Sequence, residues 1–318
     1  MSNPAQHDQV TFRSGGADAA GGADCDAWHV RGVGDALATV AGRPCVVMAH
    51  GLAGTKDSGL APFADALAAA GLDVLAFDYR GFGASGGLPR QTVSMTGQLE
   101  DYRAALAAAA ALPGVDPQRL VLWGVSLAGG HVLAAAAGRD DVAAVVALTP
   151  LVDGLAAGRH ALAHHTKRQM LRSTAAGVRG RVAQLRGRPD VMMPVVGHPG
   201  DTAALTLDGC YEAYHAIAGP TWQNEVSATV GLELGNHRPG RQAAGIRCPL
   251  LVQIADFDRS APPYAAAKAA VKGRAEVRHY PCDHFDVYAG ARWHDAVVAH
   301  QVRFLTRHLA PAPAGLPA

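Results

Sequence analysis

The chain has 318 residues, of which 49% are hydrophobic and 17% are charged, and its formal net charge at pH 7 is +1. A chain of this length can bury a large core, and it carries no charge excess that would attract nucleic acid or an anionic membrane. The composition therefore argues against both as partners and indicates an ordinary globular protein.

The expected strands begin with a hairpin, in which residues 9–14 and 25–32 flank a Gly/Ala-rich turn. Further strands are expected at 44–51, 72–81, 119–124, 142–150, 248–256 and 275–281. Helical periodicity predicts helices at 62–71, 95–112, 127–138, 262–273 and 293–309. Continuous apolar strands that alternate with helices predict an α/β fold, with a mostly parallel central sheet covered by helices on both faces.

Residues 151–247 interrupt this alternation and are rich in His, Arg, Gly and Pro. We interpret them as a partly helical cap insertion into a core formed by residues 1–150 and 248–318. The cap should lie over the carboxyl edge of the sheet, where open α/β sheets bind ligands. It would then supply substrate contacts from Trp222, Tyr214 and Met193. The alternative is a loosely packed subdomain without a role in binding.

The segment "VLWGVSLAGG" (121–130) predicts a strand, a tight turn with Ser126 at its centre, and a helix. This arrangement is typical of a nucleophile elbow, except that Ala128 replaces the second glycine of G-x-S-x-G. Glycines flank such an elbow because the serine backbone is strained and the strand and helix nearly touch. Ala128 adds only one methyl group, and two glycines follow it. We therefore interpret Ser126 as a nucleophile rather than as an incidental turn residue.

A nucleophilic serine needs a histidine base and a carboxylate that orients it. On sheets of this type the order along the chain is Ser, acid, His, each just after a strand. Asp258 and His284 meet this requirement, and Asp153 is an alternative acid after the 142–150 strand. The oxyanion would be bound by the backbone N–H groups of Leu52 and Leu127.

Other polar side chains near these motifs are expected to be structural. His50 should shape its own loop, His131 should pack or hydrogen-bond within its helix, and Cys282 should fill a buried space. Asp256 should point elsewhere if Asp258 faces the histidine. Three histidines at helical spacing lack a neighbouring Cys or carboxylate, so they indicate an exposed helix rather than a metal site; they are His160, His164 and His165.

No cofactor is expected, because the chain has neither a P-loop nor a G-x-G-x-x-G turn after a strand. The first sixteen residues lack the apolar core of a secretory signal, and no apolar run approaches the roughly 18 residues that span a bilayer. The cysteines are odd in number and scattered, which suits reduced thiols in a cytoplasmic protein; they are Cys25, Cys45, Cys210, Cys248 and Cys282.

Residues 46–91, 120–132 and 283–290 resemble the α/β-hydrolase superfamily. More narrowly, they resemble hydrolases related to dienelactone hydrolases, prolyl-dipeptidyl-peptidase-like enzymes and fungal polyketide transferases. The resemblance extends over about residues 25–155 and 245–310. It implies the same nucleophile, acid, base and oxyanion donors as the motifs above. In the superfamily's "FDYRGFGASGG" segment, it implies that Asp78 and Arg80 form a structural ion pair.

Two classes of function fit this chain. The first is a serine hydrolase that cleaves a carboxylic ester through an acyl-enzyme, with acyl transfer, thioester cleavage or amide cleavage as alternatives. The second is a catalytically silent scaffold that binds a ligand, although such a binder has no need to keep all three side chains. We expect a medium-sized, partly apolar ester or acyl substrate, and the sequence leaves a homodimer open.

Overall fold

A computed structural model describes residues 7–15 and 22–311. Its centre is an eight-stranded sheet with the strand order β1-β2-β4-β3-β5-β6-β9-β10. Residues 1–6 lie outside the described residues, and so does most of the Gly/Ala-rich turn expected between the first two strands. Residues 1–6 belong to the N-terminal segment in which we expect no secretory signal.

The sheet is mostly parallel, as the apolar strand pattern predicts. At one edge, β1 (His7–Ser14) and β2 (Ala23–Val30) form the expected antiparallel hairpin, and β2 runs antiparallel to β4 (Asp73–Phe77). The other strands run parallel to β4 and to one another; they are β3 (Arg43–Ala49), β5 (Val115–Val125), β6 (Val142–Leu148), β9 (Leu250–Ala255) and β10 (Glu276–Tyr280).

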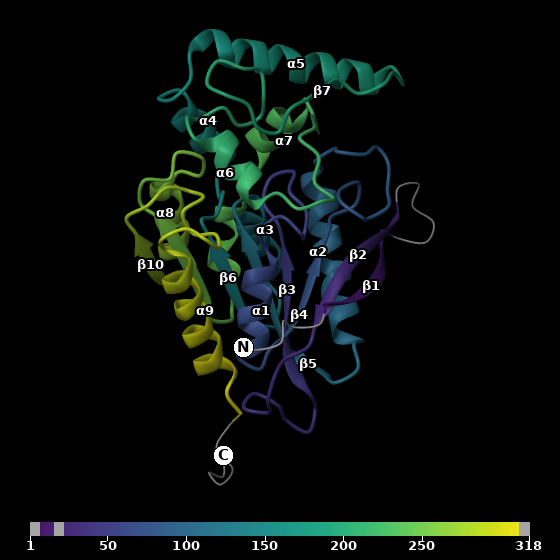
Figure 1. The fold of residues 1–318 in the computed structure, drawn as a ribbon, viewed down its shortest axis with the longest axis vertical. Coiled ribbons are helices and arrows are strands. Elements are labelled where there is room, and N and C mark those ends of the chain that lie inside the picture. The colour runs from purple at the N-terminus through teal and green to yellow at the C-terminus, as the bar shows by residue number, and fades with distance from the viewer. Residues whose placement is uncertain (1–6, 16–21, 312–318) are drawn as a thin grey trace.

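Helices cover both faces of the sheet (Figure 1), and this explains why its central strands are continuously apolar. One face packs against α1 (Ala61–Ala69) and α9 (His294–Leu309), whose Phe63 and Phe304 are fully or almost fully buried. The other face packs against α2 (Met95–Ala110), α3 (Leu127–Ala136) and α8 (Pro263–Lys272), with side chains such as Leu106 and Leu133 in that core.

Residues 149–249 connect β6 to β9, although these two strands are neighbours in the sheet. The connection contains α4 (Gly154–Ala161), α5 (Lys167–Leu185), α6 (Cys210–Ile217) and α7 (Val230–Asn236). It also contains the two-residue strands β7 (Met192–Met193) and β8 (Val226–Ser227), and the short helices η1 (Pro239–Arg241) and η2 (Ala243–Gly245). In Figure 1 the helices α4 to α7 lie beyond one end of the sheet. None of the described helices combines the length and apolarity needed to cross a bilayer.

Candidate active site

Ser126 occupies the tight turn between β5 and α3, with a left-handed backbone at φ 58° and ψ −117°. A side chain at Gly124 would place its Cβ only 2.3 Å from the carbonyl oxygen of Ala128. A Cβ at Gly130 would lie 2.1 Å from the carbonyl oxygen of Leu151. A bare α-carbon is therefore required at Gly124, where β5 approaches α3, and at Gly130, where α3 approaches the segment after β6. Position 128 itself accommodates a methyl group, which is fully buried.

The structure brings Ser126, Asp258 and His284 together. Asp258 lies in the loop after β9 and His284 in the loop after β10. The His284 Nδ1–H donates to Asp258 Oδ2 at 2.6 Å, and His284 Nε2 lies 3.0 Å from Ser126 Oγ. The other carboxylate oxygen of Asp258 accepts the backbone N–H groups of Ser260 and Ala261 at 2.8 and 2.6 Å. The carboxylate is thus held in place on both oxygens, and it orients the imidazole toward the serine.

Burial and charge act in opposite directions on the imidazole. His284 is 4% exposed and Asp258 is 3% exposed. Burial disfavours the charged imidazolium, but the charge of Asp258 and its hydrogen bond outweigh this effect and raise the pKa of His284 above its usual 6.5. The surroundings of His284 therefore favour its protonated form.

The alternative acid has a different role in the structure. Asp153 precedes α4, and its carboxylate accepts the backbone N–H of Ala156 at 3.0 Å, so it caps that helix. Asp256 accepts a hydrogen bond from the surface residue His279 at 2.6 Å and so points elsewhere. The chain order alone left both Asp153 and Asp258 open, and only the contact with His284 separates them.

The remaining histidines near the site contact the backbone or other side chains. His50 Nδ1–H donates to the carbonyl of Gly51 at 2.9 Å, and His131 Nε2–H donates to Gln98 at 2.9 Å. His160 differs from the expected exposed helix, because it is half-buried and donates to the carbonyl oxygen of Asp258 at 3.1 Å. Within residues 7–15 and 22–311, no group of three His, Cys, Asp or Glu side chains is placed to hold a metal ion.

A cavity opens beside Ser126 and His284. The core contributes backbone and side chains after β3 and β10, and the insertion contributes apolar and aromatic side chains. The lining is formed by His50, Gly51, Leu52, Gly54, Ser58, Ser126, Leu205, Tyr214, Ile217, His284, Phe285 and Tyr288. Trp222 does not line this cavity but stacks on Tyr214, with ring centroids 5.0 Å apart. Met193 is buried in β7 and does not line it either.

A sequence model of the α/β-hydrolase fold family matches residues 44–291. The chain is an α/β hydrolase. It is 36% identical to the quorum-quenching protein AidA of Acinetobacter baumannii over 267 residues. This alignment covers 83% of this chain and 86% of AidA. It is 32% identical over 157 residues to the thiohydrolase aneE of Aspergillus aculeatus, about 49% of each chain. Among solved structures, the α/β hydrolase GrgF from Penicillium sp. sh18 has the same fold, with a TM-score of 0.75 at 22% identity over 96% of this chain and all of that chain.

The loop after β3 in this hydrolase carries Leu52, and it is bound by the insertion from one side. The Tyr214 hydroxyl donates to the carbonyl of Leu52 at 2.7 Å, and Trp222 Nε1–H donates to the carbonyl of Ala53 at 3.1 Å. The backbone N–H of Thr221 also donates to the carboxylate of Asp57 at 3.0 Å. Two residues that the sequence suggested as substrate contacts therefore also hold the loop that carries Leu52, the expected oxyanion donor. A contact of Trp222 or Met193 with substrate stays a prediction.

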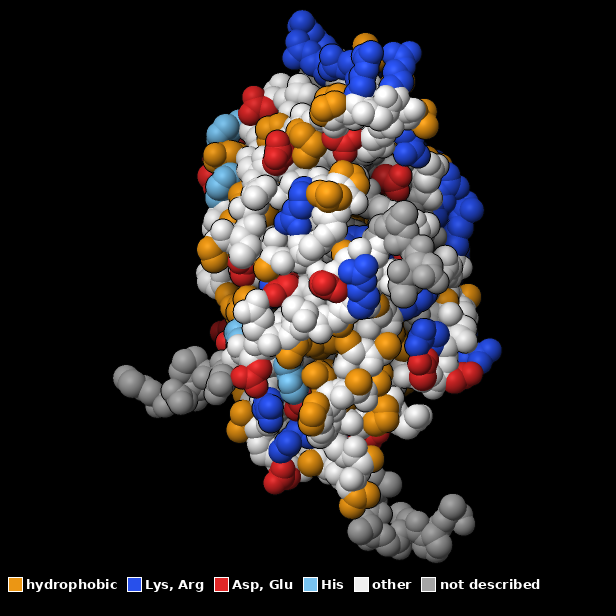
Figure 2. All heavy atoms as spheres, turned by 90° about the vertical axis from the view of Figure 1, so that its right-hand side faces the viewer, with side chains coloured by type: hydrophobic (Ala, Val, Ile, Leu, Met, Phe, Trp, Pro, Cys, Tyr) orange, Lys and Arg blue, Asp and Glu red, His pale blue; other side chains and the backbone are white. Residues whose placement is uncertain are grey.

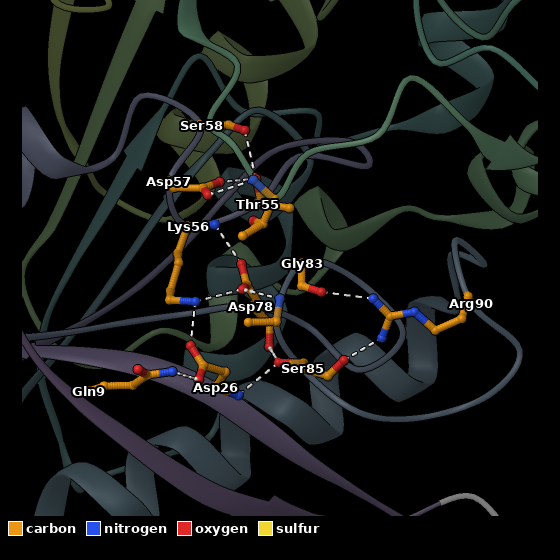
Figure 3. Close-up of polar contacts among 12 residues, drawn as sticks. Gln9, Asp26, Thr55, Lys56, Asp57, Ser58, Asp78, Gly83, Ser85 and Arg90 are labelled. Atoms are coloured by element: carbon orange, nitrogen blue, oxygen red, sulfur yellow. Dashed lines mark hydrogen bonds and ion pairs between the residues drawn. The ribbon is translucent and has the colours of Figure 1, made fainter.

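From the other side, a buried ion cluster holds the same loop (Figure 3). Lys56 is 3% exposed, and its ammonium lies between Asp78, at 2.7 Å, and Asp26. The backbone N–H of Lys56 also donates to Asp78 at 2.6 Å. Burial disfavours the ammonium, but the carboxylates outweigh this effect and raise the pKa of Lys56 above its usual value. The expected ion pair of Asp78 with Arg80 is wrong, because Arg80 binds Asp101 instead, at 2.8 Å from its Nε.

Sequence reasoning missed this cluster because its partners are far apart along the chain. Lys56 is 22 residues from Asp78, and Asp26 lies in the hairpin. The available signal was a lysine directly after "HGLAGT", in the loop that joins an apolar strand to the next helix. A lysine is rarely buried without an ionic partner. Burial of this loop would therefore have predicted a carboxylate beside Lys56.

Proposed function

We propose that the hydrolase cleaves a carboxylic ester through an acyl-enzyme formed on Ser126. The observation that carries the proposal is the continuous chain of contacts from Asp258 through His284 to Ser126 Oγ, at 2.6 and 3.0 Å. Serine alone is a poor nucleophile at neutral pH, and a buried, oriented imidazole at hydrogen-bond distance is the group that activates it.

In the first half-reaction, Ser126 Oγ attacks the ester carbonyl carbon while His284 Nε2 takes the hydroxyl proton. Asp258 stabilises the resulting imidazolium and remains ionised. The carbonyl oxygen becomes an oxyanion, which accepts the N–H groups of Leu127 and Leu52. Leu127 begins α3, where the first N–H groups have no intrahelical acceptor, so its donor is available. The intermediate collapses as His284 returns the proton to the leaving alcohol.

In the second half-reaction, a water molecule attacks the acyl carbon and gives its proton to His284. The oxyanion re-forms at the same two N–H groups, and its collapse returns the proton to Ser126 Oγ with release of the carboxylic acid. The same histidine therefore acts as base and then as acid in each half-reaction. Apart from the ester and one water molecule, these steps use only residues of the described chain.

The lining of the cavity supports a partly apolar acyl group. Leu205, Ile217 and Phe285 present apolar surface beside the serine, and Tyr214 and Tyr288 add aromatic rings. Apolar walls with few polar groups are typical of sites for small organic ligands. The insertion supplies three of these five side chains, so we assign it the role of a cap that selects the substrate.

Thioester hydrolysis or acyl transfer is the second candidate. Two relatives favour it by the activities in their names. One is the thiohydrolase above, and the other is a polyketide transferase of Stachybotrys chlorohalonatus that is 32% identical over 161 residues. The same nucleophile, base and oxyanion donors serve both reactions, because only the leaving group or the acceptor differs.

One set of assays tests both candidates. The parent protein and Ser126→Ala are compared on p-nitrophenyl esters of graded acyl length, on matched acyl thioesters, and by fluorophosphonate labelling. We expect labelling only of the parent and a loss of about 10⁴-fold or more in kcat for the variant. An esterase rate retained by Ser126→Ala would refute the nucleophile. A parent that neither turns over nor labels would indicate the silent ligand-binding scaffold.

A further inference from the structure

Helix α5 is the outermost element of the insertion and forms one end of the molecule (Figure 1). Its inner face is built from small residues, among which Ala176, Gly177 and Gly180 are buried. A Cβ at Gly177 would lie 3.0 Å from the carbonyl oxygen of Ala228, so the helix packs closely on the segment beneath it. The opposite face is therefore held pointing away from the body of the protein.

Large apolar side chains are exposed along this outer face. Leu171 is 70% exposed, Val178 49%, Val182 38% and Leu185 80%. They follow one another at spacings of seven, four and three residues, which places them on one side of the helix. We call these four residues the α5 stripe. Single exposed apolar residues are ordinary, but a row of them on one helix marks an interaction surface.

Cationic side chains accompany the stripe. Residues 154–189 contain no Asp or Glu and eight Lys or Arg residues, which are Arg159, Lys167, Arg168, Arg172, Arg179, Arg181, Arg186 and Arg188. Figure 2 shows Lys and Arg side chains gathered at this end of the molecule. The seven from residue 167 onward are exposed. Among the described residues, no ion pair joins any of these seven side chains to a carboxylate.

We propose that α5 docks the hydrolase on an anionic lipid surface. The α5 stripe would enter the boundary between headgroups and acyl chains, and the flanking arginines would bind lipid phosphates. This inference goes beyond the proposed hydrolysis and does not depend on it. The expectation of no membrane partner rested on the net charge of the whole chain, and that sum conceals the clustering on α5.

Three other occupants fit the surface less well. A second copy docked through the same helix would bring two cationic faces together, which repel each other. A nucleic acid offers phosphates, but it has no apolar layer for exposed Leu171 and Leu185. A protein partner of the helix-in-groove kind would have to supply a groove that is both acidic and apolar. A lipid surface provides negative charge and an apolar layer at once, and it accepts a protruding helix without a matching groove.

Vesicle co-sedimentation of the full chain tests the proposal. We expect binding to phosphatidylcholine vesicles that contain phosphatidylglycerol, weak binding to phosphatidylcholine alone, and weaker binding as salt increases. The variant Arg172→Gln/Arg179→Gln/Arg186→Gln should bind about 100-fold more weakly, because each basic residue at an anionic surface contributes about fivefold. The variant Leu171→Gln/Leu185→Gln should lose about tenfold or more, since two apolar side chains no longer enter the interface.

Matched controls remove the same groups elsewhere. Lys268→Gln/Lys272→Gln/Arg303→Gln makes the same change in net charge at exposed positions on α8 and α9. Leu88→Gln/Val271→Gln removes two apolar side chains that are 84% and 78% exposed outside the insertion. Both control variants should bind vesicles like the parent. Melting temperatures and turnover of a short soluble ester should be unchanged in all four variants, which would show that the fold is intact.

Several results would overturn the proposal. They are equal binding by the α5 and control variants, binding to neutral vesicles that salt does not weaken, or α5-dependent binding to duplex DNA as tight as that to vesicles. A dimer that requires Leu171 and Leu185, in a protein that binds no vesicles, would assign the α5 stripe to a second copy. Ser126→Ala should bind vesicles like the parent, so failure of the docking proposal and failure of the proposed reaction are distinguishable.

Discussion

The hydroxyl of Tyr214 offers a direct test of how the insertion acts on the loop that carries Leu52. It is 5% exposed and donates to the carbonyl of Leu52 at 2.7 Å. The N–H of that same residue is the proposed second oxyanion donor. Tyr214→Phe removes one oxygen atom and leaves the aromatic ring that lines the cavity. The Leu52–Ala53 peptide then loses this hydrogen bond, and the loop can shift and displace the N–H of Leu52, which belongs to the preceding peptide unit.

The expected magnitude follows from the lost hydrogen bond. A neutral hydrogen bond contributes about 1 kcal/mol, and a buried group left without its partner costs about 1–3 kcal/mol. If this cost falls mainly on the transition state, kcat decreases by about tenfold, since about 1.4 kcal/mol corresponds to one factor of ten. Complete loss of an oxyanion donor costs about 10²- to 10³-fold, so a displaced donor should cost less than that.

The assay measures kcat, KM and melting temperature with a short p-nitrophenyl ester. Tyr211→Phe is the matched control, because it removes a hydroxyl from the same helix, α6, without touching the loop. We expect Tyr214→Phe to lower kcat with little change in KM, and Tyr211→Phe to change neither. An unchanged kcat with a lower melting temperature would show that the hydroxyl only stabilises the fold. An increase in KM alone would make Tyr214 a substrate contact instead.

The other predictions concern the proposed triad and the elbow. Asp258→Asn should lower kcat by about 10⁴-fold, whereas Asp153→Asn should leave kcat nearly unchanged because that residue caps a helix; steady-state kinetics of both variants decide, and the opposite ranking would move the acid to Asp153. Because the pKa of His284 is raised and only the neutral imidazole accepts the serine proton, kcat/KM should increase with pH through a midpoint above 6.5. A pH–rate profile with its midpoint below that value would contradict the stated effect of Asp258. Gly124→Ala should destabilise the protein by about 1–3 kcal/mol and reduce turnover, because its Cβ meets the carbonyl of Ala128. Ala128→Gly should keep both properties near those of the parent, and urea unfolding of the two variants checks this.

Much of the fold follows from local patterns that a single sequence contains. Continuous apolar strands alternating with amphipathic helices specify a parallel sheet, since each strand must be covered on both faces. The elbow around Ser126 is also local, because the strain and the close strand–helix contact fall within a few residues. The position of His284 after the last strand follows from the same alternation.

Only the tertiary structure decided which groups meet across the chain. Asp153 and Asp258 both follow strands, and the paths of their loops determine that one caps a helix while the other contacts His284. Asp78 pairs with Lys56, because the loop after β3 lies over the end of β4, and Arg80 pairs with Asp101 instead. Periodicity predicts that a helix has two faces, but it does not tell which face is covered. In α5 the small residues pack inward, where backbones approach closely, and the leucines and arginines are therefore left outside.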